Sequence, residues 1–71
     1  MITNPEIDQD GNKWWYNSDG QFHQENGPAI ITADGRKYWY QNGKPHREDG
    51  PAVEYPNGGS KFWFINGKRI K

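Results

Sequence analysis

The sequence predicts an all-β protein: a single-domain antiparallel array of tandem β-hairpins, with a twisted sheet and no helix. One observation is composition. The chain of 71 residues has four Trp, four Tyr and three Phe beside few aliphatic residues, with nine Gly and five Pro. Aromatic and β-branched residues favour pleated, half-buried strands. The other observation is an aromatic pattern that recurs at a fixed interval, which is typical of stacked supersecondary units.

The repeat is centred on Trp15, Trp39 and Trp63, which follow one another at intervals of 24 residues. Each tryptophan lies in an aromatic triplet preceded by a lysine: Lys13-Trp14-Trp15-Tyr16, Lys37-Tyr38-Trp39-Tyr40 and Lys61-Phe62-Trp63-Phe64. A turn follows each triplet, at Ser18-Asp19-Gly20, Asn42-Gly43 and Asn66-Gly67. We therefore divide the chain into about two and a half units: an N-terminal cap strand (1–11), repeat 1 (12–35), repeat 2 (36–59) and a truncated repeat 3 or cap (60–71).

The elements follow from this pattern in order. The N-terminal segment 3–7, in which Pro5-Glu6-Ile7 echoes Pro28-Ala29-Ile30, is expected to pair with the strand that begins near Lys13. Asn-Gly and Asp-Gly dipeptides predict type I′ hairpin turns, because both central residues of that turn need positive φ; they stand at Asp10-Gly11, Asp34-Gly35, Asn42-Gly43, Asn57-Gly58 and Asn66-Gly67.

In repeat 2 we expect a strand over 37–41, a tight turn, and then one bent or bulged strand over 44–55. Its bend would lie at Glu48-Asp49-Gly50-Pro51, where Gly and Pro suit a bulge. Units with the same pattern stack most simply if each contributes an even number of strands, so that equivalent strands run in the same direction.

Residues 39–52 resemble a known repeat. Their sequence is Trp39-Tyr40-Gln41-Asn42-Gly43-Lys44-Pro45-His46-Arg47-Glu48-Asp49-Gly50-Pro51-Ala52. It resembles the Trp-Tyr-x-Asn-Gly-x-x-His-Arg-x-Asp-Gly-Pro-Ala repeat of many phage and giant-virus proteins, which is similar to the variant MORN repeats. The resemblance covers roughly residues 12–71, except that Ile70-Lys71 replace the His-Arg pair. It implies a tandem hairpin array used for interaction, in a phage or viral accessory protein.

Strand alternation divides the aromatic triplets between two faces. One face carries only rings and is expected to form the core: Trp14, Tyr16, Tyr38, Tyr40, Phe62 and Phe64. The other face is the candidate binding face: Lys13, Trp15, Lys37, Trp39, Lys61 and Trp63. Two readings of that second face stay open. Its rings and ammonium groups could stack bases, sugars or a partner's side chains, or the bent segments could cover the tryptophans against Ile31, Ala33 or Val53 and leave the lysines as solubilising residues.

Secondary candidates lie in the bent segments and at the C-terminal end. His23, His46 and Arg47 belong to the turn motif, and both histidines are expected to hydrogen-bond across the bend near Asn26 or Asp49. Lys68 and Arg69 form a basic cluster on an expected edge strand, where charges usually prevent edge-to-edge pairing. The spacing typical of zinc ligands is absent from the sequence, there is no Cys, and the acidic pairs stand in turn motifs. We therefore expect no metal, no cofactor and no enzymatic activity.

Nine basic and nine acidic residues cancel, so the basic balance of a dedicated duplex-DNA binder is missing. With no apolar run of membrane-span length, we expect a cytoplasmic protein, in the host cell if it is phage-encoded. Our first hypothesis is a small module that binds a host or viral protein and modulates or inhibits it. The alternatives are a binder of single-stranded nucleic acid or a nucleotide through the Lys/Trp ladder, and a structural piece of a self-assembling complex, with a homodimer left open.

Overall fold

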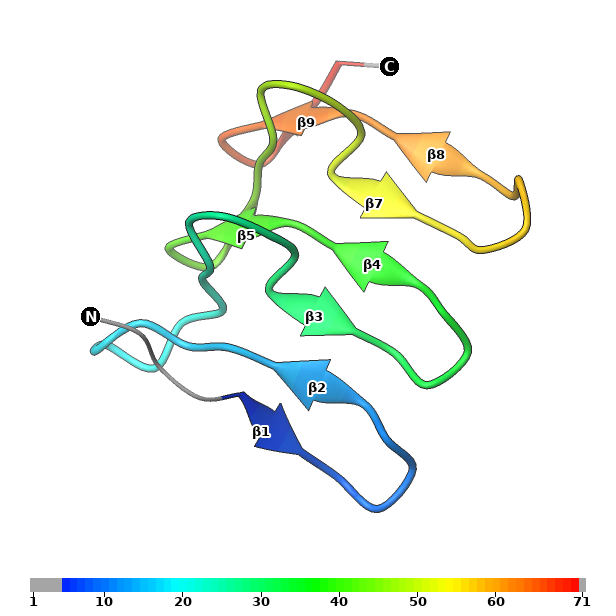
Figure 1. Ribbon diagram of the computed structural model, residues 1–71. Coiled ribbons are helices and arrows are strands. Elements are labelled where there is room, and N and C mark those ends of the chain that lie inside the picture. Colours follow the sequence, from blue (N-terminus) through cyan, green and yellow to red (C-terminus); the bar gives the residue numbers. More distant parts are fainter. Residues whose placement is uncertain (1–4, 71) are drawn as a thin grey trace.

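A computed structural model describes residues 5–70, which form ten short strands and no helix (Figure 1). The strands are β1 (Glu6–Ile7), β2 (Lys13–Trp14), β3 (Ile30–Ile31), β4 (Lys37–Tyr38), β5 (Tyr40–Gln41), β6 (Lys44–Pro45), β7 (Val53–Glu54), β8 (Lys61–Phe62), β9 (Phe64–Ile65) and β10 (Lys68–Arg69). All pairings are antiparallel, in a six-stranded sheet of order β1-β2-β3-β4-β7-β8 and two hairpins, β5-β6 and β9-β10. The all-β hairpin fold predicted from the sequence is confirmed.

Each aromatic strand serves two sheets because it changes partner at its central tryptophan. The Trp39 N–H donates to the Ala52 carbonyl at 2.7 Å, while the Trp39 carbonyl accepts from the His46 N–H at 3.0 Å. Trp15 makes the equivalent pair of bonds, although in repeat 1 the small hairpin is reduced to a single bridge between Tyr16 and Phe22. The equivalent strands β2, β4 and β8 are two positions apart in the large sheet, as expected for units with an even number of strands.

The expectation of one bent strand over residues 44–55 was wrong. The segment forms two strands, β6 and β7, which belong to different sheets and are separated by a loop at 46–52. The loop leaves the strand path because the Arg47 N–H turns to the Phe64 carbonyl of the next unit at 3.1 Å. The Arg47 guanidinium then bonds the Pro51 carbonyl at 3.1 Å and closes the loop on itself.

The turns divide into two kinds. Asn42-Gly43, Asn57-Gly58 and Asn66-Gly67 have positive φ at both residues, as a type I′ turn requires. At Asp10-Gly11 and Asp34-Gly35 only the glycine has positive φ, so the type I′ prediction was wrong there. Those hairpins have longer loops that the preceding side chain stabilises: the Asp8 carboxylate accepts the N–H groups of Asp10 and Asn12, as Asp side chains commonly do in turns.

The two predicted histidine bonds have a different partner from the one expected. His23 Nδ1 accepts the Asn42 N–H at 3.1 Å, and His46 Nδ1 accepts the Asn66 N–H at 3.0 Å. Both donors lie in the Asn-Gly turn of the following unit, because that turn leaves an N–H facing the preceding repeat. The histidines therefore connect consecutive repeats, rather than the two sides of their own bend.

Among residues 5–70, the fully buried ones are Ala29 and Ala52, each with no exposed surface. The six rings expected to form the core are only half-buried, because one sheet layer and its hairpins cannot enclose side chains of that size. Five residues from neighbouring strands lie in one row on the same face of the large sheet, namely Trp14, Ile30, Tyr38, Val53 and Phe62. Phe22 packs between Tyr16 and Tyr40, with ring centroids 5.2 and 5.7 Å away.

The N-terminal prediction is confirmed for Glu6 and Ile7, which pair with Trp14 and Lys13; residues 3 and 4 of that segment lie outside the described part of the chain. Within residues 5–70 there is no helix of the length and hydrophobicity needed to cross a membrane.

Candidate binding face

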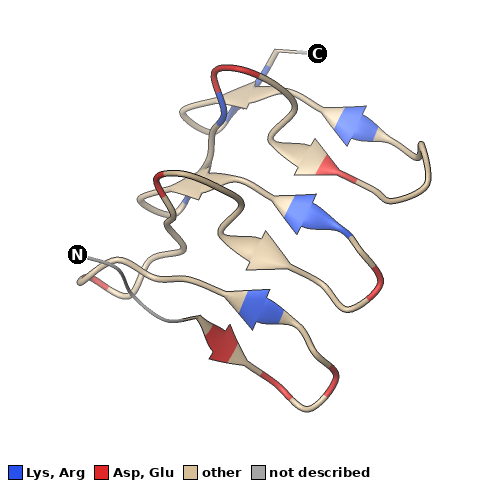
Figure 2. Cartoon of the chain, viewed as in Figure 1, with Lys and Arg blue, Asp and Glu red and all other residues tan. Residues whose placement is uncertain are grey.

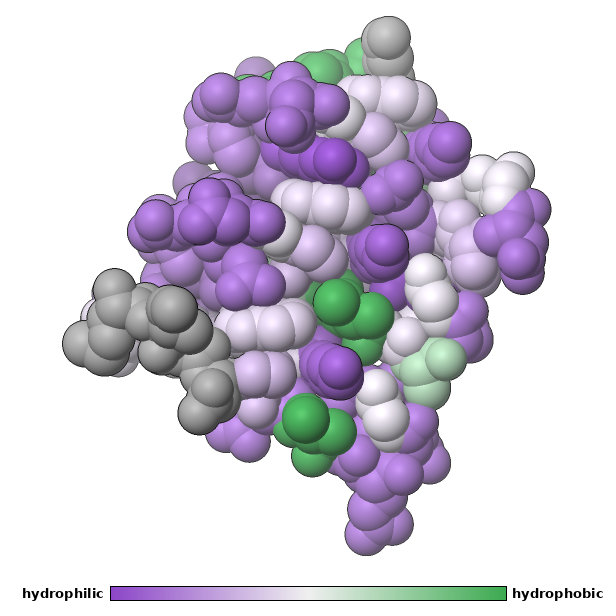
Figure 3. Space-filling view, viewed as in Figure 1, coloured by the Kyte–Doolittle hydropathy of each residue, from purple (hydrophilic) through white to green (hydrophobic). Residues whose placement is uncertain are grey.

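The lysine ladder lies on one face of the large sheet. Cross-strand pairing places six residues in a single row, in the order Ile7, Lys13, Ile31, Lys37, Glu54 and Lys61. All three lysines are exposed, and the structure shows no ion pair between them and other residues of 5–70. Figure 2 shows the basic residues of β2, β4 and β8 at equivalent places in successive units, and Figure 3 shows aliphatic and polar side chains alternating down this face.

The central tryptophans adjoin this row at the bend of each strand. Because the Trp39 N–H continues the pairing of β4 with β7, alternation directs its side chain to the same face as Lys37. Trp15, Trp39 and Trp63 are all half-buried. The Arg47 guanidinium lies over the Trp39 ring, 3.9 Å from the centroid. A residue of the bent segment thus covers part of Trp39, while the lysines, which both interpretations of this face leave in solvent, are exposed.

Arg47 is held in place by its own loop. Its Nε donates to Asp49 Oδ1 at 3.1 Å, and its Nη1 donates to the Pro51 carbonyl at 3.1 Å and to Glu54 Oε1 at 3.3 Å. A Cβ at position 50 would lie 2.9 Å from the Arg47 Cζ, so glycine at this position leaves space for the guanidinium. In repeat 1 the neutral Gln24 takes the equivalent place and donates to the Pro28 carbonyl at 3.0 Å.

An open groove of about 670 Å³ separates the two Gly-Pro loops. The loop of repeat 1 forms one wall, the loop of repeat 2 forms the other, and Trp39 and Gln41 lie between them. The lining residues are Glu25, Asn26, Gly27, Pro28, Trp39, Gln41, His46, Arg47, Glu48 and Asp49. The hydrogen bond from Gln41 Nε2 to the Gln24 carbonyl, at 2.7 Å, ties the base of the groove to the first loop.

The remaining sequence candidates lie outside this arrangement or support it. His23 and His46 each place Nε2 3.6 Å from the glutamate two residues later, Glu25 and Glu48. Lys68 and Arg69 are exposed on β10, which pairs with β9, and Arg69 lies 4.7 Å from the centroid of the Phe62 ring. Residues 5–70 contain no group of three or more His, Asp or Glu side chains placed to hold a metal ion.

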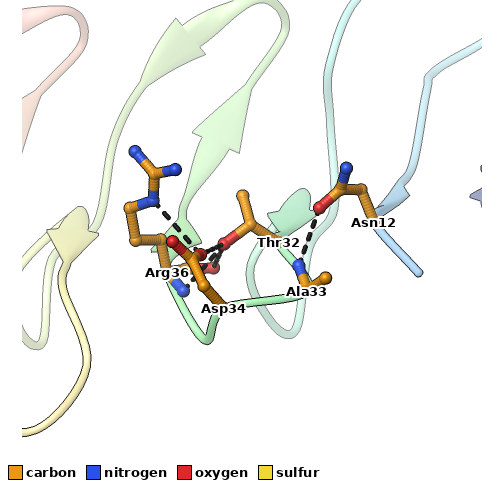
Figure 4. A network of polar contacts seen from close by, with 5 residues as sticks. All are labelled: Asn12, Thr32, Ala33, Asp34 and Arg36. Atoms are coloured by element: carbon orange, nitrogen blue, oxygen red, sulfur yellow. Dashed lines mark hydrogen bonds and ion pairs between the residues drawn. The ribbon is translucent and has the colours of Figure 1, made fainter. Parts of the chain in front are cut away.

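The hairpin ends of the large sheet carry a separate polar network (Figure 4). The Thr32 hydroxyl donates to the Asp34 carboxylate, and Arg36 Nε reaches the same carboxylate oxygen at 3.3 Å. The hydrogen bond from Thr32, followed by that from Arg36, lowers the pKa of Asp34. Asn12 Oδ1 accepts the Ala33 N–H at 2.7 Å and links adjacent hairpins. These groups stabilise the turns between strands and do not line the groove.

Trp39, His46 and Arg47 are candidates from the sequence alone, but the groove that they line is not predicted by it. The acidic pairs Glu25-Asn26 and Glu48-Asp49 indicate turns in the sequence, and Pro28 is not marked there as a candidate. The recurrence of Gly-Pro in repeats 1 and 2 was the available signal, because two equivalent loops on neighbouring units must stand side by side.

Comparison of this chain with protein-family models, with curated proteins and with solved structures finds no match.

Proposed function

We propose that this chain is a small non-enzymatic module that binds a protein through the face carrying Trp39 and the adjoining groove. The observation that carries the proposal is the groove itself, an open space of about 670 Å³ with a half-buried tryptophan between two loops. Those loops are fixed by Arg47, Gln24 and the histidine bonds to the following turns. A groove held in shape before binding lowers the entropic cost of association.

The residue types at the groove favour a protein partner. Trp and Arg are enriched among the residues that contribute most to protein–protein affinity, especially where an aromatic side chain is surrounded by polar groups. Trp39 has such surroundings: Arg47 stacks over its ring, and polar residues of the two loops lie around it. The resemblance to viral repeats supports a host protein as the target, which the module would block or modulate.

The test is affinity capture of the tagged chain from host-cell lysate, with and without nuclease, followed by mass spectrometry. Asn26→Trp fills the groove from an exposed loop position, and Ser18→Trp adds the same bulk to an exposed turn outside it. We expect one dominant protein that survives nuclease treatment, disappears with Asn26→Trp and persists with Ser18→Trp. Capture that is equal for both variants would overturn the proposal.

A second candidate function has its own observation, the exposed row of Lys13, Lys37 and Lys61 without ion pairs. Equivalent strands two positions apart put these ammonium groups about 10 Å from one another, in a row that can contact successive parts of a polyanion such as single-stranded nucleic acid. Titration with a ten-residue oligothymidine tests this function. Binding that weakens steeply with salt and is lost when the three lysines are changed to Gln would establish it, and affinity independent of salt would exclude it.

A further inference from the structure

We infer that the groove between the two Gly-Pro loops receives a basic side chain, arginine or lysine, from an extended segment of the protein partner. This inference rests on the proposed function, because it names the chemistry of the partner at the same site.

Carboxylates stand on both walls of the groove. Glu25 belongs to the loop of repeat 1, and Glu48 and Asp49 belong to the loop of repeat 2. Their side chains are 79, 83 and 88 % exposed, respectively. A cation entering between the loops is therefore approached by carboxylates from two sides, and it does not have to displace an established partner from a buried position.

The basic groups of this chain leave most of that charge available. In the described part of the chain, the ion contacts of Glu25 and Glu48 are with the neighbouring histidine Nε2, at 3.6 Å each. Arg47 bonds Asp49 but also Glu54, which does not line the groove. The lining therefore carries three carboxylates against one guanidinium that is shared with a fourth acid, so the formal charge of the lining is negative when His46 is neutral.

The floor of the groove suits the aliphatic stem of a long basic side chain. Trp39 and Pro28 offer apolar surface beside the amide of Gln41, and Lys and Arg stems pack along apolar surface while their charged heads stay among polar groups. Arg47 already shows how a guanidinium is accommodated here: it stacks on Trp39 while it bonds a carboxylate and a carbonyl oxygen.

The same charges disfavour an anionic occupant. A phosphate or carboxylate in the groove would face Glu25, Glu48 and Asp49 at close range, whereas the free lysines lie in the strands of the large sheet (Figure 2). The net charge of the chain is zero, but the charges are separated: carboxylates predominate in the groove and exposed lysines lie along the large sheet. Charge complementarity of this kind contributes to specificity and to the rate of encounter.

The experiment is a nuclear magnetic resonance titration of the isotope-labelled chain with the blocked peptide Ala-Arg-Ala-Arg-Ala. Two matched probes carry citrulline or glutamate in place of arginine. We expect the arginine peptide to shift the backbone amides of residues 25–27 and 46–49 and the Trp39 indole N–H. We expect the citrulline peptide to bind at least about tenfold more weakly, because it keeps the shape of arginine and loses its charge.

Two double variants test whether the charge dependence of peptide binding arises at the groove. Glu25→Gln with Glu48→Gln should weaken the arginine peptide by about tenfold, whereas Asp10→Asn with Asp19→Asn, which alters exposed carboxylates of the turns, should leave its affinity unchanged. Equal binding of the arginine and citrulline peptides, preference for the glutamate peptide, or shifts confined to residues outside the two loops would overturn the inference.

Failure of this inference can be told apart from failure of the proposed function. A captured protein that is lost with Asn26→Trp but kept with the double Gln variant would reject the basic side chain and retain the protein-binding groove. A charge-dependent arginine complex at the groove, with no groove-dependent protein captured, would support the cation chemistry and reject the proposed function.

Discussion

At Ala52 one methyl group is fully buried. The Ala52 N–H donates to the Phe62 carbonyl and its own carbonyl accepts the Trp39 N–H, so its backbone joins β4 and β8 from opposite sides. Ala29 does the same between Trp15 and Tyr38. A residue held by both neighbours cannot move aside, and interiors packed in this way respond to a single added methylene group.

Ala52→Leu should therefore destabilise the fold by about 1–3 kcal/mol, because the larger side chain forces the adjoining strands apart. The free energy of unfolding from chemical denaturation measures the effect. Ala33→Leu makes the same change at an exposed hairpin position and should alter stability by less than about 0.5 kcal/mol. Equal losses for the two variants would show that the position of Ala52 is not tightly packed.

The Asp8 carboxyl makes the stability of the fold depend on pH. Its carboxylate accepts Asn12 Nδ2 and the N–H groups of Asp10 and Asn12, and the side-chain bond from Asn12, followed by the backbone bonds, lowers the pKa of Asp8. A carboxyl with a lower pKa in the folded state than in the unfolded chain stabilises the fold above the unfolded pKa of about 3.9. That stabilisation is lost as the pH falls through the folded pKa.

Asp8→Asn should therefore lower stability at neutral pH, and the difference from the parent chain should shrink between about pH 5 and pH 2. Asn17 already closes an equivalent turn as a neutral residue, with Oδ1 accepting two backbone N–H groups, so the variant should still fold. Unfolding free energies at a series of pH values provide the measurement, with Asp19→Asn as the control. A difference that stays constant with pH would contradict the assignment.

At the scale of elements, each Gly-Pro loop depends on a long polar side chain that returns to its own backbone. Gln24 performs this role in repeat 1 and Arg47 in repeat 2. The arginine also stacks on Trp39, so the second loop fixes one wall of the groove. The glycines show the difference: a Cβ at position 27 would meet Gln24 Nε2 at an ordinary 3.6 Å, whereas one at position 50 would come within 2.9 Å of the Arg47 guanidinium carbon.

Gly50→Ala should displace Arg47 from Trp39 and should be less stable than Gly27→Ala by about 1 kcal/mol, which is the usual size of a partly exposed cation–π contact. Gly27→Ala should be neutral or slightly stabilising, because alanine restricts the unfolded chain. The Trp39 indole resonance reports the displacement directly and should move only in Gly50→Ala. A Trp39 resonance unchanged in both variants would show that Arg47 does not depend on Gly50.

The sequence was informative about elements that are local and less so about those that depend on neighbours. The triplets at Trp15, Trp39 and Trp63 predicted the strands, and Asn42-Gly43 and Asn66-Gly67 predicted their turns, because both signals act within a few residues. The loop at 46–52 was missed as a separate element because its shape depends on a bond from Arg47 to Phe64 of the following unit. The groove was missed for the same reason, since its two walls lie in different repeats.

At the scale of the whole molecule, the stability of the array comes from contacts between neighbouring units. Gly43 and Gly67 donate to the Phe22 and Pro45 carbonyls of the preceding units, and the asparagine N–H groups of the same two turns donate to the histidines of those units. With fully buried side chains limited, in residues 5–70, to Ala29 and Ala52, each added unit contributes mainly through its interface, as in other repeat proteins.

The large sheet has an edge at β1, and Glu6 protects this edge from pairing with a further strand. In the described part of the chain β1 pairs with β2 alone, and Glu6 lies opposite Trp14 in the row where β3 and β7 carry Ile30 and Val53. A charge at such a position discourages pairing with a further strand. An aliphatic residue there would match the inner strands and leave the edge open to another copy.

Glu6→Val should therefore stabilise the folded chain by up to about 1 kcal/mol through its cross-strand contact with Trp14, and should also promote self-association at the β1 edge. Sedimentation velocity over a range of concentrations measures the second effect: we expect the apparent mass of Glu6→Val to rise with concentration while the parent chain changes less. Glu6→Gln removes the charge without adding apolar surface and separates the two causes. If Glu6→Val and the parent chain have the same mass at every concentration, Glu6 does not protect this edge.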